Sequence, residues 1–387
     1  MSKRYYAILP NLIVPLGGLG TDIYLPSLPS MVNEFGVSDS QMQLTITSYV
    51  LAMGLVQYLA GPVSDALGRK RLIISSLIMQ FVAVVAILFA GSVNLIIIAR
   101  FFQGLACAFM IVPARAILND CFEGDELKKK FNYLTISFAL APIIAPFIGG
   151  YCQHYFGWQA SFYFILIYIV FLLSLLVLFT KETIEHTKAF SLKQISQNYS
   201  LILHNKGFMY ITLLLSVMFG YTSLFTVLGP FIFQNKFGFS PVAYGYIALS
   251  IGIAWFMGNV TNRLFFEIAT HKKMMFALGL QTAMSTVLLI IASTSAISAV
   301  TTFIPVFFMV YAAAIIFPIF VGESLVYFPD MAASSNAFLF ASTWIAFSLY
   351  TLIATQISVD NLIPLALAYL LVNCMGYWLY FCIRKNG

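Results

Sequence analysis

The chain has 387 residues, of which 61% are apolar and only 9% charged, and its formal net charge is +6. Soluble domains are about half apolar and about a quarter charged, so this composition excludes an ordinary water-soluble enzyme or binding domain. The apolar residues form uninterrupted runs of about 20, enough for a helix to cross about 30 Å of hydrocarbon. A membrane barrel would instead show short alternating segments of about ten residues.

Twelve such runs are predicted to cross the membrane as helices, which makes the chain an all-α membrane protein. The first and last six are separated by the most polar stretch of the sequence. The predicted spans are 5–25, 41–64, 72–90, 95–118, 131–151, 158–180, 208–233, 242–262, 274–293, 297–320, 333–357 and 362–382.

The first run is interpreted as a retained span. Lys3 and Arg4 precede it as in a signal peptide, but no small-x-small cleavage pattern closes it and Asp22 lies in its last turn. The cysteines have no metal or redox spacing, and no histidine falls within a span. We therefore expect neither a metal site nor a cofactor. The cysteines are Cys107, Cys121, Cys152, Cys374 and Cys382.

The basic residues predict the orientation of the chain. With a cytoplasmic amino terminus, 17 of the 20 Lys and Arg residues fall in inner segments, Lys236 falls in an outer loop, and Arg100 and Arg115 fall inside a span. Basic residues concentrate in cytoplasmic loops, so both termini are expected in the cytoplasm. The net positive charge is then explained by the orientation of the chain in the membrane, and no nucleic acid is expected as a partner.

The polar stretch predicts two halves, residues 1–180 and 208–387, joined by a cytoplasmic linker at 181–207. A short echo supports the division, because Phe-Gly-Val-Ser at 35–38 recurs as Phe-Gly-Phe-Ser at 237–240. Transporters are commonly built from paired halves with the substrate held near the membrane midplane.

The loop after the second run has ordered glycines and charges, reading Gly-Pro-Val-Ser-Asp-Ala-Leu-Gly-Arg-Lys-Arg at 61–71. Its glycines permit close helix approach, its aspartate can favour a helix dipole, and its first arginine needs an acidic partner at the end of the fourth run. The simpler alternative is a plain positive loop. The pattern predicts a conformational gate made of Gly61, Asp65, Gly68, Arg69 and Asp120.

Together with three other segments, this loop resembles the signature of the major facilitator superfamily, in particular the Bcr/CflA subfamily of bacterial drug:H⁺ antiporters. Residues 21–29, 100–104 and 141–150 match in order, and 181–183 reads Lys-Glu-Thr. The likeness is dense over 20–185 and thin over 208–387. It implies a major facilitator fold of about 12 helices and proton-driven export by alternating access in a bacterial inner membrane.

Residues 141–150 look like the antiporter motif of that group, with alanine where the fifth residue is usually glycine. The residues concerned are Ala141, Ala145, Pro146, Gly149 and Gly150. Small residues also permit close packing of helices in lipid, so a tightly packed helix with no exchange role is the alternative.

Three charges lie inside predicted spans, where they are costly and usually mark function. Asp22 and Arg100 are expected at overlapping depths, with Asp22 as proton carrier and Arg100 tuning its affinity. Arg115 lies 15 residues beyond Arg100, about 22 Å along the helix, and either lines the same pathway or reaches the headgroups. An interfacial helix end remains the alternative for Asp22, and a structural hydrogen-bond hub for Arg100. Glu323 at the inner edge of the tenth run is the next proton-site candidate.

The predicted substrate cavity is apolar and aromatic, for a small amphipathic molecule bound by a monomer in the lipid bilayer. A transporter of a specific metabolite, siderophore or nutrient would share the fold, and a non-transporting sensor is the alternative from another class. No phosphate-binding G-x-x-x-x-G-K-[ST] loop supports an ATP-driven pump. The candidate cavity residues are Tyr49, Gln57, Gln103, Arg115, Tyr221, Phe225, Trp255 and Asn259.

Overall fold

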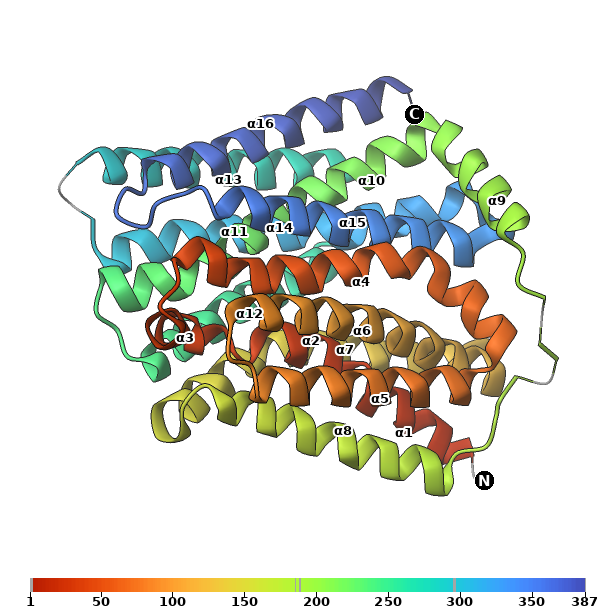
Figure 1. The fold of residues 1–387 in the computed structure, drawn as a ribbon. Helices are drawn as coiled ribbons and strands as arrows, with labels where there is room; N and C mark the ends of the chain where they lie inside the picture. Colours follow the sequence, from red (N-terminus) through yellow and green to blue (C-terminus); the bar gives the residue numbers. More distant parts are fainter. Residues whose placement is uncertain (1–2, 185, 188, 295–296, 387) are drawn as a thin grey trace.

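The computed structural model describes residues 3–184, 186–187, 189–294 and 297–386, and Lys188 of the predicted linker lies outside them. Within these ranges the chain is helical, without strands (Figure 1). Twelve helical segments are long and apolar enough to cross a membrane. This confirms the all-α membrane fold expected from the sequence.

Several spans consist of more than one element, and one helix outside the spans, α9, follows the sixth. In chain order the elements are α1 (Lys3–Ile13), α2 (Pro15–Asp22), η1 (Leu25–Ser27), α3 (Leu28–Phe35), α4 (Asp39–Leu67), α5 (Arg69–Leu88), α6 (Val93–Cys121), α7 (Gly124–Phe156), α8 (Gln159–Phe179), α9 (Leu192–His204), α10 (Lys206–Met218), α11 (Gly220–Phe231), η2 (Ile232–Lys236), α12 (Pro241–Leu264), α13 (Thr270–Ser293), α14 (Ala299–Tyr327), η3 (Pro329–Met331), α15 (Ala332–Ala354) and α16 (Ile363–Asn386).

The start of α1, the end of α16 and α9 all lie at the same end of the bundle (Figure 1). We call this the terminal end and the opposite one, which holds α3, the distal end. Within the first six spans, α6 packs against α4 and α5, and α7 against α2. Within the last six, α14 packs against α12 and α13, and α16 against α10 and α13.

Two helix pairs join the first six spans to the last six: α4 packs against α15, and α7 against α12. At the distal end, α11 also contacts η1 and α3. Hydrogen bonds cross the same boundary there, from Thr47 Oγ1 to Thr351 Oγ1 (2.9 Å) and from Gln234 Nε2 to the carbonyl oxygen of Pro26 (3.0 Å). The two sets of helices are thus joined firmly at their distal end.

The first span extends further than the predicted range 5–25. It runs from Lys3 to Phe35, because the helical path breaks and restarts at prolines. Pro15 is the first residue of α2, and Pro26 and Pro29 are the second residues of η1 and α3. A missing backbone N–H costs little at these positions. Asp22 therefore lies 13 residues before the helical end of its span and not in its last turn.

The fifth and tenth spans also exceed their predicted ranges of 131–151 and 297–320. Both helices have extra polar turns at the terminal end: α7 already begins at Gly124, and α14 continues as far as Tyr327. Hydropathy marks only the hydrocarbon-length part of such helices. Glu323 consequently lies within α14, where it is half-buried.

Candidate functional site

Arg100 of α6 is fully buried between the first two spans. Its Nη1 donates to the carbonyl oxygen of Gly20 (2.7 Å) and to Oε1 of Gln103 (2.7 Å), and its Nε donates to the carbonyl oxygen of Thr45 (3.4 Å). A buried cation needs such partners, because an unpaired one costs several kcal/mol or more. Arg100 is therefore a hydrogen-bond hub that ties α6 to the first two spans.

Two tyrosine rings flank the Arg100 guanidinium. Its carbon lies 4.5 Å from the ring centre of Tyr24 and 4.1 Å from that of Tyr49, distances at which cation–π attraction operates. Its Nη2 has no hydrogen-bond partner among the described residues. The arginine thus retains one donor that a further acceptor can take.

Asp22 ends α2 close to this hub. It is half-buried, and the Arg100 charge acts on its carboxyl group. The three ion pairs among the described residues do not include this pair. From the other half, Tyr244 of α12 is within range of the Asp22 charge, is fully buried, and has no partner for its hydroxyl among the described residues. Asp22 therefore lies within electrostatic range of Arg100 in α6 and of Tyr244 in α12.

The small residues of α7 make close backbone approaches at the same place. An added Cβ at Gly149 would overlap the carbonyl oxygen of Ile23, and one at Gly150 would come 2.6 Å from that of Pro241. Ala145 is fully buried one turn earlier. Two consecutive glycines thus hold α7 against the residue after Asp22 on one side and against the start of α12 on the other.

A second charged cluster lies at the terminal end, between α4, α5 and α6. Arg69 Nη1 is 2.5 Å from Asp65 Oδ1 and 2.8 Å from Ser64 Oγ, and its Nε is 3.1 Å from Asp120 Oδ2. The Arg69 side chain is only 10% exposed and that of Asp120 16%, so solvent screens this cluster less than a surface pair. The expected partnership of Arg69 with Asp120 is present.

Glu182, just after α8, completes this cluster, and the sequence predicted no role for it beyond the Lys-Glu-Thr resemblance. Its carboxylate accepts from the backbone N–H groups of Arg69 (2.8 Å) and Lys70 (3.1 Å), the first residues of α5. A carboxylate is favourable at a helix amino terminus. Gly68 has φ +93°, and an added Cβ there would lie 2.6 Å from Glu182 Oε2, so this glycine makes room for the cap. Gly61 has open space around its Cα.

The helix α9 fastens the terminal end of the α4–α15 pair. Tyr199 donates to the carbonyl oxygen of Tyr58 (2.6 Å), whose hydroxyl bonds Ser342 Oγ of α15 (3.0 Å). Phe338 packs against both tyrosine rings. Burial raises the pKa of the Tyr199 phenol to about 12, so it remains a donor at neutral pH. The linker thus bridges both sets of helices.

An aromatic cluster gathers near the middle of the last six spans. Phe219, at the break between α10 and α11, has its ring centre 5.8 Å from Trp255, 5.2 Å from Phe317 and 6.1 Å from Trp344. Trp344 is 5.6 Å from Phe347. Four of the five rings are half-buried, the exception being Phe347. They come from four spans and meet at mid-helix, the level at which transporters hold their substrates.

Residues 12–351 match the family model described as the Major Facilitator Superfamily. The chain belongs to that superfamily. It is accordingly a membrane transporter and not an enzyme, as the sequence predicted.

Relatives and solved structures agree with this placement. The bicyclomycin resistance protein homolog of Haemophilus influenzae is 26% identical over 100% of this chain and 98% of its own. The multidrug transporter MdfA of Edwardsiella piscicida is 29% identical over 63% of this chain and 60% of its own. The crystal structure of a D-xylose–proton symporter, 15% identical, covers 99% of this chain and 98% of its own with a TM-score of 0.77, which shows the same fold.

Within this superfamily fold, the predicted cavity residues fall in different environments. Tyr49, Gln57, Gln103, Tyr221 and Phe225 are buried, whereas Arg115, Trp255 and Asn259 are half-buried. Tyr49 belongs to the Arg100 hub and Tyr221 stacks on Tyr369, so both have packing roles. Gln57 Oε1 and Gln103 Nε2 lack hydrogen-bond partners among the described residues, which leaves one acceptor and one donor for a ligand.

Arg115 lies between the two sets of helices, with its guanidinium carbon 5.4 Å from the Phe138 ring centre and 5.9 Å from that of Phe340 in α15. Of the aromatic cluster, the sequence analysis named only Trp255. Most aromatic residues in membrane spans only pack against other helices. The spacing of residues along the chain does not distinguish them from rings that meet across four spans. One sequence signal pointed to Glu182: it directly follows the sixth predicted span. That span ends on the same side of the membrane as the Gly-Arg-Lys of residues 68–70, which precedes the third span.

Proposed function

We propose that this transporter is a proton-coupled exporter of small amphipathic molecules that works by alternating access. The terminal end is cytoplasmic in this account, and the membrane is the bacterial cytoplasmic membrane. The protein acts as a monomer, without a cofactor. The energy comes from protons that enter as substrate leaves.

The observation that carries the proposal is the position of Asp22. A carboxyl group inside a span is costly to insert and is retained for function by default. This one lies beside a buried arginine with a free donor and beside the residue against which Gly149 packs. It therefore occupies the joint at which the two sets of helices meet distally.

The coupling follows from how the charge of Asp22 is balanced. A neutral carboxyl is compatible with the closed distal joint, where the buried Tyr244 is within range of Asp22 and Gly149 packs against the next residue, Ile23. Opening the joint admits water and lets Asp22 approach the free Nη2 of Arg100, which favours the charged form. Substrate release to the outside and proton uptake by Asp22 are then alternative events at one joint.

The terminal end supplies the opposing gate. The cluster of Arg69, Asp65 and Asp120 holds the ends of α4, α5 and α6 together, and α9 bridges α4 to α15. Charge pairs of this kind form and separate between two discrete packings more readily than a continuous apolar core. The gate is proposed to tighten when the distal end opens.

The substrate class follows from the aromatic cluster of Phe219, Trp255, Phe317, Trp344 and Phe347, with Gln57 and Gln103 as polar partners. Flat apolar molecules gain from stacking on such rings, and few charged groups are present to demand a fixed ionic pattern. The relatives named for bicyclomycin resistance and multidrug transport are in keeping with this class.

The test is a susceptibility and export screen of cells with and without the protein, over many drugs and siderophores. Export predicts that expression lowers accumulation of at least one amphipathic compound and that a protonophore abolishes the difference. Proton-coupled accumulation of a nutrient, with no compound exported, would replace the proposal by import.

A further inference from the structure

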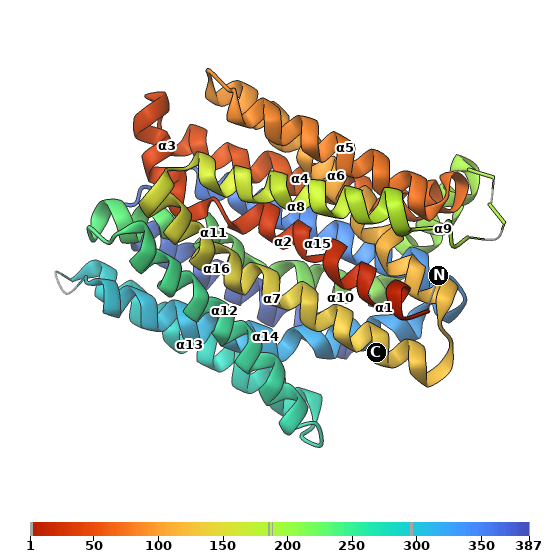
Figure 2. The ribbon, with the colours of Figure 1, turned by 90° about the horizontal axis from the view of Figure 1, so that it is seen from below.

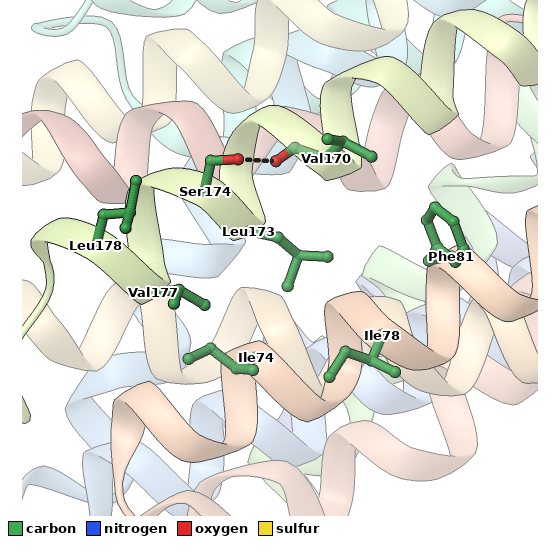
Figure 3. Close-up of a pocket in the computed structure, with 8 residues that line it drawn as sticks. All are labelled: Ile74, Ile78, Phe81, Val170, Leu173, Ser174, Val177 and Leu178. Atoms are coloured by element: carbon green, nitrogen blue, oxygen red, sulfur yellow. Dashed lines mark hydrogen bonds between the residues drawn. The ribbon is translucent and has the colours of Figure 1, made fainter.

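An apolar groove of about 520 Å³ runs along the outside of the bundle between α5 and α8. The two helices lie side by side over their length (Figure 2). Ile74, Ile78 and Phe81 of α5 face Leu173, Ser174 and Val177 of α8 across it (Figure 3). Lipid is the solvent of such a surface.

The lining offers no polar partner to a ligand. The one hydroxyl in it, Ser174 Oγ, already donates to the carbonyl oxygen of Val170 in its own helix (2.8 Å). The three α5 residues, spaced by four and three positions, form one stripe that rises about 10 Å along the helix. This length and surface suit the upper part of one acyl chain.

The groove has a basic mouth at its terminal end. Arg71 lies three residues before Ile74 on the same stripe of α5, and Lys181 follows four residues after Val177. Glu182 holds these two segments together, since its carboxylate accepts from the first backbone N–H groups of α5. Arg71 and Lys181 each adjoin this contact in the chain, so both belong to one junction.

The charges at that junction leave a cationic surplus. Arg69 is paired with Asp65 and Asp120, whereas Arg71 and Lys181 are exposed and take part in none of the three ion pairs among the described residues. Lys70 and the Glu182 carboxylate also adjoin this junction in the chain. Among the described residues, the junction therefore has four cations and three carboxylates, and its surplus of positive charge lies with the exposed Arg71 and Lys181.

We propose that this groove binds an anionic phospholipid of the cytoplasmic leaflet, with one acyl chain between α5 and α8 and its phosphate against Arg71 and Lys181. Basic pockets between spans on the cytoplasmic side suit acidic headgroups. The groove fixes the chain by packing, and the basic mouth selects the headgroup. The leaflet rests on the orientation given in the proposed function, whereas the binding itself does not depend on transport.

The experiment is native mass spectrometry of the purified full-length protein with equal amounts of phosphatidylglycerol and phosphatidylethanolamine. The wild-type protein is expected to retain phosphatidylglycerol at least about fivefold over phosphatidylethanolamine, since each basic residue near a headgroup is worth about that factor. Arg71→Gln/Lys181→Gln is expected to bring the ratio close to one. The matched control, Lys129→Gln/Lys272→Gln, removes two exposed cations elsewhere at the terminal end and should leave it unchanged.

A photolabel gives a second readout, which locates the bound lipid in the wild-type protein itself. Phosphatidylglycerol with a diazirine in its acyl chain should label peptides covering 74–81 and 170–178 of the wild-type protein, and Ser174→Trp, which fills the groove, should abolish that labelling. Labelling only outside these segments overturns the proposal, as does an unchanged lipid ratio in the double variant. Neither measurement uses transport, so loss of this site and loss of the export function give separate results.

Discussion

Arg69 binds two carboxylates and a hydroxyl at the terminal end, and its loss leaves Asp65 and Asp120 without a cation. Arg69→Ala should lower transport kcat/KM about tenfold, the factor expected when a charge-assisted hydrogen bond is lost, at nearly normal expression. Lys70→Ala is the matched control, because that neighbouring side chain is in none of the ion pairs among the described residues. Equal activity of both variants in an efflux assay would remove Arg69 from the gate.

Arg100 depends on the forked geometry of its guanidinium. Lysine retains the charge, but its single nitrogen cannot replace both Nη1 and Nε, which bond different partners. It also lacks the flat group that stacks between two tyrosines. Arg100→Lys is predicted to lose at least about tenfold in transport, the equivalent of one or two charge-assisted hydrogen bonds, and to unfold at a lower temperature. Transport at the wild-type rate would show that only the charge matters.

At this scale the sequence revealed the isolated charges and the partnership of Arg69 with Asp120, but not the partners of Arg100. Asp22, Arg100 and Arg69 stand out because charge is rare in an apolar chain. The capping role of Glu182 and the rings around Phe219 depend on which helix ends and faces meet, and spacing along the chain carries no such information. The prolines of the first span show the same limit, since whether each breaks or starts a helix depends on local geometry.

The helix α7 acts through two glycines that allow contact on opposite sides. Gly149→Ala would place a methyl group against the carbonyl oxygen of Ile23 and push α7 away from the Asp22 joint. We expect a loss of most transport activity and a destabilisation of about 1–3 kcal/mol, the usual cost of overpacking. Thermal unfolding and efflux assays measure the two effects.

Gly279 of α13 provides the control for Gly149, since an added Cβ there meets nothing within 4 Å. Gly279→Ala should be neutral or stabilising by up to about 1 kcal/mol, because alanine is the better helix former. If both alanine variants behave alike, the close approach of α7 has no special role and the antiporter resemblance of 141–150 reflects packing only.

Hydropathy predicted that each spanning helix exists, because every span needs about 20 apolar residues. It did not predict where the helices end, since α7 and α14 continue as polar helical turns beyond their apolar part. The linker was expected only to be a polar stretch, whereas it contains α9, a 13-residue helix. Its docking depends on Tyr58 and Phe338, which come from other parts of the chain.

For the whole molecule, the placement of both ends and α9 at one end of the bundle and the 17 basic residues of the inner segments predict a cytoplasmic carboxyl terminus. A reporter active only in the cytoplasm, fused to the carboxyl terminus, should be active, and an alkaline phosphatase fusion there should not. The opposite pattern would contradict the orientation and, with it, the leaflet assigned to the phospholipid.

The central claim is that Asp22 couples substrate export to proton entry, and one measurement tests it most directly. Everted vesicles with an acidic lumen are given a substrate, and gradient-driven uptake is compared with gradient-free counterflow for wild type, Asp22→Glu and Asp22→Asn. Asparagine keeps the shape but cannot ionise, so Asp22→Asn should lose gradient-driven uptake and retain counterflow, with partial uptake for Asp22→Glu. Full gradient-driven uptake by Asp22→Asn would contradict the account and move the proton site, with Glu323 the next residue to test.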